Sequence, residues 1–188
     1  MATATNNAAN VTAGKPKIGG AIFCAPLGTT LPTDTTAQLA EAFMNLGYAG
    51  KDGVVNANSP ETEKATAWGG DVVMNFQTGR PDTFKFTLLE SMNVNVLKVI
   101  YGDKNVTGTL KEGITIQVNA EDGVYHCWVI DMILKGGAAK RIVIPNACIT
   151  ELGEISYVDN KEVGYSITLS ALPDEKGQFH YEYIKAAA

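Results

Sequence analysis

The sequence is poor in the residues that usually cross-link a chain or carry out chemistry. Its three cysteines, Cys24, Cys127 and Cys148, are odd in number and far apart, which argues against a disulfide framework and favours a reducing site of synthesis. All three have largely apolar neighbours, so we predict that they are buried small hydrophobic residues. Neither His126 nor His180 belongs to a spacing that is typical of metal ligands.

The short motifs of common enzymes are missing too. The sequence contains no phosphate-binding glycine loop, no Gly-x-Ser-x-Gly elbow and no paired-cysteine motif. Two carboxylate pairs, Glu61 with Glu63 and Glu121 with Asp122, are more typical of solvated turns than of an acid–base pair, which needs two groups converging on one substrate. We therefore predict no catalytic residue, no metal site and no cofactor, and we expect that the protein is not an enzyme.

Long apolar runs and clusters of basic residues are also lacking. No stretch of about 18 apolar residues is present, so we predict no membrane span. Residues 1–17 have neither the basic start nor the apolar stretch of a secretory signal. The formal net charge is -5 and the densest basic site is the pair Lys140 and Arg141, which argues against tight non-specific binding of nucleic acid.

Alternation of apolar and polar residues is the dominant pattern. With 188 residues, 45% of them hydrophobic and 19% charged, the composition is typical of one globular domain with a sizeable core. Several short alternating segments separated by turn residues predict a mainly β fold, an antiparallel sandwich or barrel with one or two short α-helices. The predicted strands are residues 18–26, 71–77, 83–88, 114–118, 124–134, 141–152, 165–172 and 179–183.

The clearest local unit lies within residues 65–102. Period-two alternation in residues 71–77 and 83–88 predicts two strands, each with one face on a core and the other on solvent. Between them, Gly79 and Pro81 are turn residues, so we predict that the two strands form a hairpin. The side chains expected on the core face are Val72, Met74, Phe76, Phe84, Phe86 and Leu88.

A helical period follows this pair of strands. Ser91 is a candidate N-cap and Gly102 a candidate stop, which predicts a short helix that braces the hairpin and buries Leu97. The apolar stripe consists of Val94, Leu97 and Tyr101, widened by Ile100. A weaker pattern predicts another short helix over residues 35–43.

Two features are expected in the later strands. Residues 124–134 are apolar on both faces apart from His126 and Asp131, which predicts a central strand covered on both sides. Pro145 lies inside another extended segment and has no N–H to donate, so we expect it at an edge or a bulge.

Two segments are less regular. Residues 1–17 are small and polar and are predicted to form a flexible N-terminal arm, with residues 18–188 as a single domain. Residues 47–63 (GYAGKDGVVNANSPETE) are rich in glycine and asparagine, and we predict an interaction loop that becomes ordered on assembly. A plain mobile loop is the alternative.

Two runs resemble the tail tube (major tail) proteins of long-tailed bacteriophages: FMNLGYAGKDGVVNANSPETEKATAWGGDVV and DTFKFTLLESMNVNVLKVIYGD. In order they give a Gly-Tyr stretch, an acidic residue with glycine and valine, a Trp-Gly-Gly step, an alternating strand, and Thr-Leu-Leu-Glu leading into a short helix that ends in Tyr-Gly. They cover most of residues 43–103, and residues 142–172 are similar in pattern but less specific.

The resemblance implies a structural protein with a tail-tube-like β-sandwich or barrel. Its subunits would close into rings of six that stack into a hollow tube, and the genome would leave through this tube. The implied partners are further copies of the chain and other tail proteins (the tip, the terminator and the tape measure). DNA would pass without specific binding, and no membrane is involved. The protein would lie in the tail of the virion and assemble in the host cytoplasm.

Two groups of residues are expected to matter for such an assembly. The interaction loop would carry contacts between rings, and the polar faces of the two central strands would line the lumen, although an ordinary solvated face explains the second group equally well. The expected ring contacts are Lys51, Asp52, Val54, Val55, Asn56 and Asn58. The expected lumen residues are Asp71, Asn75, Gln77, Thr83, Lys85 and Thr87.

A different class of function remains open. A monomeric β-sandwich that binds a carbohydrate or another surface ligand would present a concave cluster of aromatic side chains. The candidates for such a cluster are Trp68, Trp128, Tyr125, Phe179, Tyr181 and Tyr183. A third class, a hydrolase, would need clustered polar groups that the sequence does not bring together locally.

Overall fold

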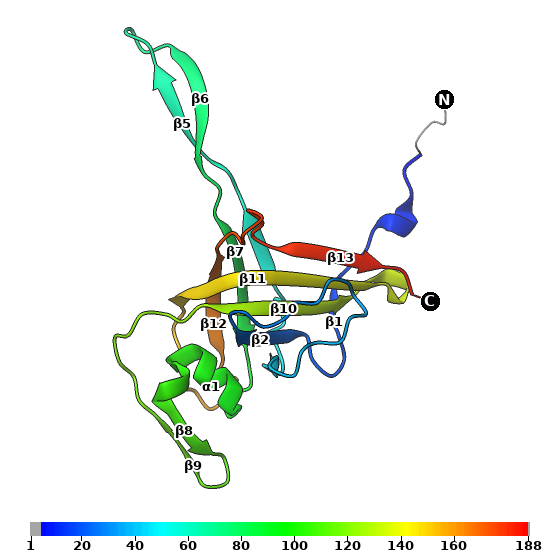
Figure 1. Ribbon diagram of the computed structural model, residues 1–188, viewed down its shortest axis with the longest axis vertical. Helices are drawn as coiled ribbons and strands as arrows, with labels where there is room; N and C mark the ends of the chain where they lie inside the picture. The colour runs from blue at the N-terminus through cyan, green and yellow to red at the C-terminus, as the bar shows by residue number, and fades with distance from the viewer. Residues whose placement is uncertain (1–4, 188) are drawn as a thin grey trace.

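The computed structural model describes residues 5–187, which form an antiparallel β body with one short helix and two projecting hairpins (Figure 1). This confirms the predicted mainly β class. The strands are β1 Lys15–Pro16, β2 Ile22–Pro26, β3 Met44–Asn45, β4 Val55–Asn58, β5 Glu61–Thr66, β6 Val72–Gly79, β7 Asp82–Leu88, β8 Val106–Thr109, β9 Gly113–Ile116, β10 His126–Ile133, β11 Ala139–Leu152, β12 Tyr165–Ala171 and β13 Tyr181–Lys185. The helix α1 is Val94–Tyr101, and single 3-10 turns span Ala8–Asn10, Asp103–Asn105 and Lys135–Gly137.

The body is a nine-stranded sheet that folds over on itself. Its order is β3-β2-β10-β11-β12-β7-β4, with β1 added to β10 and β13 added to β11. The long strand β11 pairs with β13 through residues 139–143 and with β12 through residues 147–152, so it belongs to both halves of the sheet. In Figure 1, β10, β11 and β13 run across β7 and β12, and the core fills the space between these layers.

The core is built from strand faces that alternate as the sequence predicts. In β7, the side chains of Phe84, Phe86 and Leu88 are buried, and the ring of Phe86 meets the edge of Trp128 at a centroid distance of 6.0 Å. Residues 127–131 of β10 are buried on both faces, which confirms the predicted central strand. Pro145 lies in a bulge, where two residues of β11 stand opposite one residue of β10.

The helix α1 packs against this core. Leu97 is 2% exposed, in agreement with the prediction, and Val96 and Val99 are also buried. Gly102 ends the helix with a φ of 93°, a conformation that glycine adopts without strain. The predicted N-cap is wrong by two residues, because the side chain of Asn93, not Ser91, accepts a hydrogen bond from the Asn95 N–H at 3.0 Å.

The predicted hairpin of residues 71–77 and 83–88 is wrong. The partner of β6 is β5, and the reversal lies at residues 67–71, where the Ala67 N–H donates to the Asp71 carbonyl at 2.8 Å. Residues 80–81 instead carry the chain from β6 into β7 without a reversal (Figure 1). As a consequence, β4 and β5 run beside β7 and β6 as one long two-stranded ribbon.

A proline in each strand explains why the ribbon is interrupted. Asn58 pairs with Asp82, and Glu61 pairs with Gly79, so Pro60 and Pro81 lie at the same level of the ribbon. Neither proline has an N–H to donate, and the ladder therefore breaks in both strands at once. The break separates the part of the ribbon that belongs to the body from the part that projects.

Two further expectations need correction. Residues 47–63 are not a single irregular loop, because they contain β4 and the start of β5. Residues 35–43 form no α-helix. The Asp34 carboxylate accepts hydrogen bonds from the N–H groups of Thr36 and Ala37, both at 2.6 Å, as at a helix N-cap. No helix follows, and the Arg141 guanidinium binds the carbonyls of Asp34 and Ala37, which in a helix would accept from later N–H groups.

Candidate assembly surfaces

The hairpin β5–β6, which we call the arm, projects far from the body (Figure 1). Five large apolar side chains on it are exposed, including Trp68 at the tip, which is fully exposed. The other four are Val72, Val73, Met74 and Phe76. Val72, Met74 and Phe76 were predicted to face the core, and the structure corrects this because the arm has no core beneath it. An isolated two-stranded hairpin is marginally stable in water, and a contiguous exposed apolar surface usually marks an interaction site.

The arm has two different faces. Residues directly opposite in an antiparallel pair share a face, so Met74 and Phe76 lie with their partners Ala65 and Glu63 on what we call the apolar face. Asn75 and Gln77 lie with Lys64 and Thr62 on the other, polar face. The arm therefore exposes Met74 and Phe76 on one face, whereas Val73, 65% exposed, lies in the bulge between the pairs of Met74 and Val72.

A second polar surface lies on the outside of the body. Thr83, Lys85 and Thr87 alternate with the buried residues of β7 and point away from the core. Their register partners on β12 are Ser170, Thr168 and Ser166, which extend this surface, here called the hydroxyl face. The predicted lumen residues are thus split into two groups: Thr83, Lys85 and Thr87 belong to the hydroxyl face, whereas Asp71, Asn75 and Gln77 belong to the arm.

The residues predicted to make ring contacts have mixed surroundings. Lys51 and Asp52 are exposed in a turn, and Val55 is exposed on β4. Val54 packs against the core at its edge. The two asparagines serve the ribbon itself, because Asn56 donates to the Asp82 carboxylate at 2.7 Å and Asn58 accepts a bond from Arg80 Nε at 2.5 Å. That these six residues contact other subunits remains a prediction.

The root of the arm is fixed by a buried carboxylate that the sequence analysis did not single out. Asp82 is fully buried at the start of β7 and lies 2.5 Å from Nδ1 of His180, just before β13. The His180 ring also stands edge-on to Phe84, with a centroid distance of 5.2 Å. Asp82 thereby joins β4, β7 and the segment before β13 directly below the point where the arm leaves the body.

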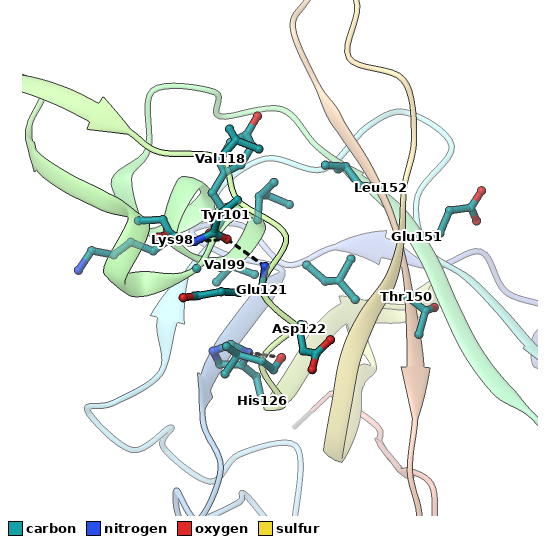
Figure 2. A pocket seen from close by; sticks show the side chains of 17 residues that line it. Lys98, Val99, Tyr101, Val118, Glu121, Asp122, His126, Thr150, Glu151 and Leu152 are labelled. Atoms are coloured by element: carbon teal, nitrogen blue, oxygen red, sulfur yellow. Dashed lines mark hydrogen bonds between the residues drawn. The ribbon is translucent and has the colours of Figure 1, made fainter.

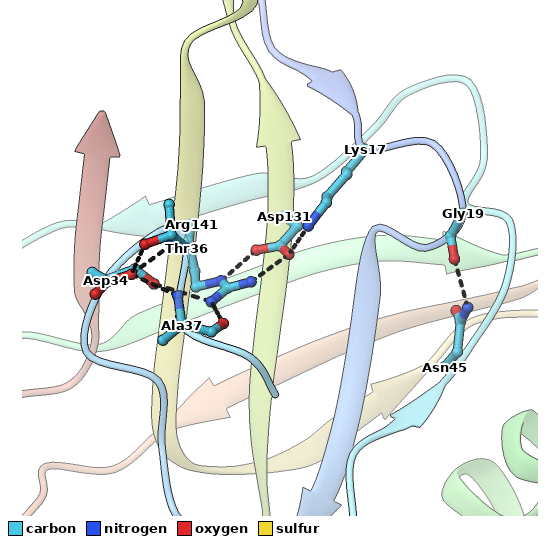
Figure 3. A network of polar contacts seen from close by, with 8 residues as sticks. All are labelled: Lys17, Gly19, Asp34, Thr36, Ala37, Asn45, Asp131 and Arg141. Carbon is cyan, nitrogen blue, oxygen red and sulfur yellow. Dashed lines mark hydrogen bonds and ion pairs between the residues drawn. The ribbon is translucent and has the colours of Figure 1, made fainter. Parts of the chain in front are cut away.

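A buried ion pair fixes the N-terminal part of the chain (Figure 3). The guanidinium of Arg141 binds the Asp131 carboxylate through two hydrogen bonds of 2.6 and 2.8 Å, and Lys17 Nζ lies 3.4 Å from the same carboxylate. Arg141 also donates to the carbonyls of Asp34 and Ala37, at 3.0 and 2.7 Å. Asp131 therefore holds the segment before β2, and Arg141 holds the segment around residue 34, against the β10–β11 pair.

An open pocket of about 330 Å³ lies between α1, the segment before β10 and the end of β11 (Figure 2). Its polar lining includes Tyr101, Glu121, Asp122 and His126. Burial lowers the pKa of His126, although the Val124 carbonyl bonded to its Nδ1 at 3.2 Å opposes the shift. Across residues 5–187, no three side chains among His, Cys, Asp and Glu lie close enough to hold a metal ion.

The three cysteines differ in burial. Cys24 and Cys127 are buried, as predicted, and Cys148 is half-buried. Burial raises the pKa of Cys24 and of Cys127, so both thiols remain protonated at neutral pH.

Within the described range, no helix has the length and apolar character needed to cross a membrane.

The aromatic residues do not form the concave cluster that a ligand-binding module would need. Trp68 stands at the tip of the arm, whereas Trp128 is fully buried in the core. Tyr181 and Tyr183 stack on each other at 6.5 Å on β13. The structure therefore separates side chains that the monomeric binding hypothesis requires to converge.

An antiparallel β body that carries an unpaired apolar arm defines a class of protein: a structural subunit whose exposed surfaces are completed by other chains. The comparison with protein families agrees. The family model described as phage tail tube protein matches residues 3–188, and the chain belongs to this family. Its role is therefore that of a structural protein of a phage tail, which indicates a non-enzymatic function and a place in the tail of the virion.

The solved structures include the anti-feeding prophage cap (AFP tube terminating cap), which is 12% identical to this chain, with a TM-score of 0.41 over 95% of this chain and 96% of that chain. No curated protein matches the sequence.

Proposed function

We propose that this protein is the subunit of a tail tube, in which rings of six copies stack into a hollow channel for the genome. The observation that carries the proposal is the arm. It places five large apolar side chains in solvent on a hairpin that cannot bury them itself. Association with other copies would remove this surface from water, at about 25 cal/mol per Å² of apolar area.

Ring closure would use the open ends of the sheet. The strands β3 and β4 end the sheet order, and each leaves one edge without a partner in the part of the chain that the structure describes. Unpaired strand edges invite pairing with another chain, and a closed ring abolishes them. Pairing around the ring would align the hydroxyl faces of successive subunits.

We assign the hydroxyl face to the lumen. It is made of small hydroxyl side chains and one cation, Lys85, and the Thr168 hydroxyl on it donates to the Glu151 carboxylate at 2.9 Å. The formal net charge of -5 also gives each subunit an excess of acidic groups, which repel phosphate. DNA would pass along such a wall without specific binding.

Contacts between rings would involve the arm, the N-terminal segment and the turn at Lys51 and Asp52. The N-terminal segment is tied to the body at Thr12, whose hydroxyl accepts a hydrogen bond from the Lys135 N–H at 2.7 Å. The remaining partners would be the tip and terminator proteins and the tape measure, with assembly in the host cytoplasm.

Electron microscopy of the purified chain tests the proposal. Size-exclusion chromatography and negative stain should show rings or tubes for the natural sequence. Phe76→Asp should abolish tubes without loss of folding, because Phe76 is 42% exposed on the arm and supports no core. A chain that stays monomeric at every concentration, with the same elution volume for both proteins, would refute the proposed function.

A further inference from the structure

Asp82 marks the boundary between the body and the arm. It pairs with Asn58 of β4, and Pro81, immediately before it, breaks the ladder toward the arm. The carboxylate of Asp82 is fully buried, which is costly for a charged group unless hydrogen bonds satisfy it. The groups that bind this carboxylate therefore decide how firmly the last ladder pair of the body is held.

Two side-chain donors bind the carboxylate of Asp82. Asn56 Nδ2 donates to Oδ1 at 2.7 Å from the neighbouring strand β4, and Nδ1 of His180 donates to Oδ2 at 2.5 Å. Among the described residues, no lysine or arginine forms an ion pair with Asp82. Asn56 belongs to the ribbon and moves with it. His180 is therefore the donor that ties the ribbon to a different part of the fold, 98 residues away in the chain.

The segment that presents His180 is anchored independently of the ribbon. The carboxylate of Asp174 accepts hydrogen bonds from the Gln178 N–H at 2.9 Å and from the Tyr181 hydroxyl at 2.6 Å, which closes the turn before β13. Phe179 packs against the core, and β13 pairs with β11 from Tyr181 onward. In Figure 1 this turn reaches the start of β7. The core and β11 therefore fix the position from which His180 donates.

The ribbon is weak at this point without such a tie. The strand β4 has four residues, three of them exposed, and it lies at the edge of the sheet with β7 as its partner. Edge segments with few buried side chains are the parts of a fold that open most readily. A carboxylate of Asp82 that lost a donor would draw water into the end of the pairing. The strand β4 would then separate from β7, starting at Asn58.

We infer that Asp82 and His180 form a latch that confines bending of the ribbon to the level of Pro60 and Pro81, so that the segment before β13 controls the direction of the arm. With the latch closed, the last pair of the body is rigid and the arm bends only beyond it. With the latch open, β4 separates from β7 and the arm loses its orientation although the core stays intact. The latch belongs to the single chain, so its test does not depend on the proposed assembly.

Hydrogen exchange of the unassembled chain tests the latch in the variant His180→Leu. Leucine retains an apolar contact with Phe84, whose ring lies 5.2 Å from that of His180, but it donates no hydrogen bond. Exchange in residues 54–59 should become at least about tenfold faster, because a buried charged group has lost a donor, whereas exchange in β10 should not change. His180→Asn should restore protection, because the amide Nδ2 can donate from nearly the same position as Nδ1.

His126→Leu is the matched control for this experiment. His126 is bonded through Nδ1 to the Val124 carbonyl, away from the ribbon, so exchange in residues 54–59 should stay at the natural rate. Unchanged exchange at these residues in His180→Leu would overturn the inference. Equal acceleration in β10 would also overturn it, because it would indicate a general loss of stability.

The two tryptophans allow a direct measurement of the motion of the arm. Trp68 is fully exposed at the tip of the arm, whereas Trp128 is fully buried in the core. In time-resolved fluorescence anisotropy, Trp128 should follow the tumbling of the body, and the additional nanosecond component should come from Trp68. The amplitude of this component should increase in His180→Leu and return to the natural value in His180→Asn. An amplitude that is the same in all three proteins would contradict control of the arm by His180.

A second substitution decides the outcome if His180→Leu does not fold. Asp82→Asn in the same protein removes the buried charge, and its amide oxygen can still accept the bond from Asn56. The combination of Asp82→Asn with His180→Leu should therefore fold and unfold at a higher urea concentration than His180→Leu alone. If the combination is no more stable, the loss comes from other contacts of His180, and the latch is refuted.

Discussion

Arg141 is a cation with only 3% of its side chain exposed, and the carboxylate of Asp131, 6% exposed, neutralises it. Two hydrogen bonds to Asp131 and two to backbone carbonyls use the planar fork of the guanidinium almost completely. A buried pair of this kind adds little net stability compared with apolar residues, but removal of one partner leaves the other charge buried without compensation.

Arg141→Met should therefore destabilise the fold strongly. We expect a loss of about 3–5 kcal/mol in the free energy of unfolding, measured in urea, because Asp131 would keep only Lys17 at 3.4 Å. Lys140→Met is the matched control, since Lys140 forms an ion pair with Glu182 at 2.9 Å in which both side chains are partly exposed. The control should lose at most about 1 kcal/mol. Equal losses in both variants would contradict a special role for Arg141.

The ion pair shows what the sequence could and could not predict at this scale. Asp131 was visible as a charge inside an apolar run, and Arg141 as half of a basic pair. Their equal distance from Gly136 places them opposite each other if the chain reverses there, which is the observed register. The bond between Asp82 and His180 had no such signal, because 98 residues separate the two side chains.

Among the elements, the ribbon formed by β4, β5, β6 and β7 shows why strands are easier to predict than their partners. Alternation identified the segments of β6 and β7 and which side chains in each share a face. It did not distinguish a face that packs on the core, as in β7, from one that lies outside it, as in β6. Turn residues were present both at residues 67–71 and at residues 78–82, so the turn chemistry alone did not select the true reversal.

The prolines of the ribbon predict that body and arm are separable. Replacement of residues 62–78 by a short glycine-containing turn should leave the free energy of unfolding within about 1 kcal/mol of the natural value, because the exposed arm contributes little to the core. The same variant should form no tubes in negative stain.

Deletion of residues 51–58 is the contrasting variant. It removes β4, which pairs with β7 over four residues, and uncovers the buried carboxylate of Asp82, so it should prevent folding as judged by circular dichroism. If this deletion folds and the arm deletion does not, the division between body and arm is wrong.

At the scale of the whole molecule, two surfaces have different characters: the apolar arm at one end of β7 and the hydroxyl face along the strand. The first suits contacts with other subunits. The second suits contact with water, because small hydroxyl groups stay hydrated. Our assignment of the hydroxyl face to the lumen predicts that charges on this face affect the passage of DNA. The contacts between subunits make no prediction about DNA.

Lysines on the hydroxyl face should slow the passage of DNA without preventing assembly. Thr87→Lys, Ser166→Lys and Thr168→Lys add three positive charges to each subunit at positions outside the core. Virions with this variant should show normal tails in the microscope but release DNA more slowly at low salt. The difference should shrink at 1 M salt, where the Debye length falls from about 8 Å to about 3 Å. The control carries lysines at Thr107, Leu110 and Thr115 of the β8–β9 hairpin. If both variants slow release equally, or neither does, the hydroxyl face does not line the channel.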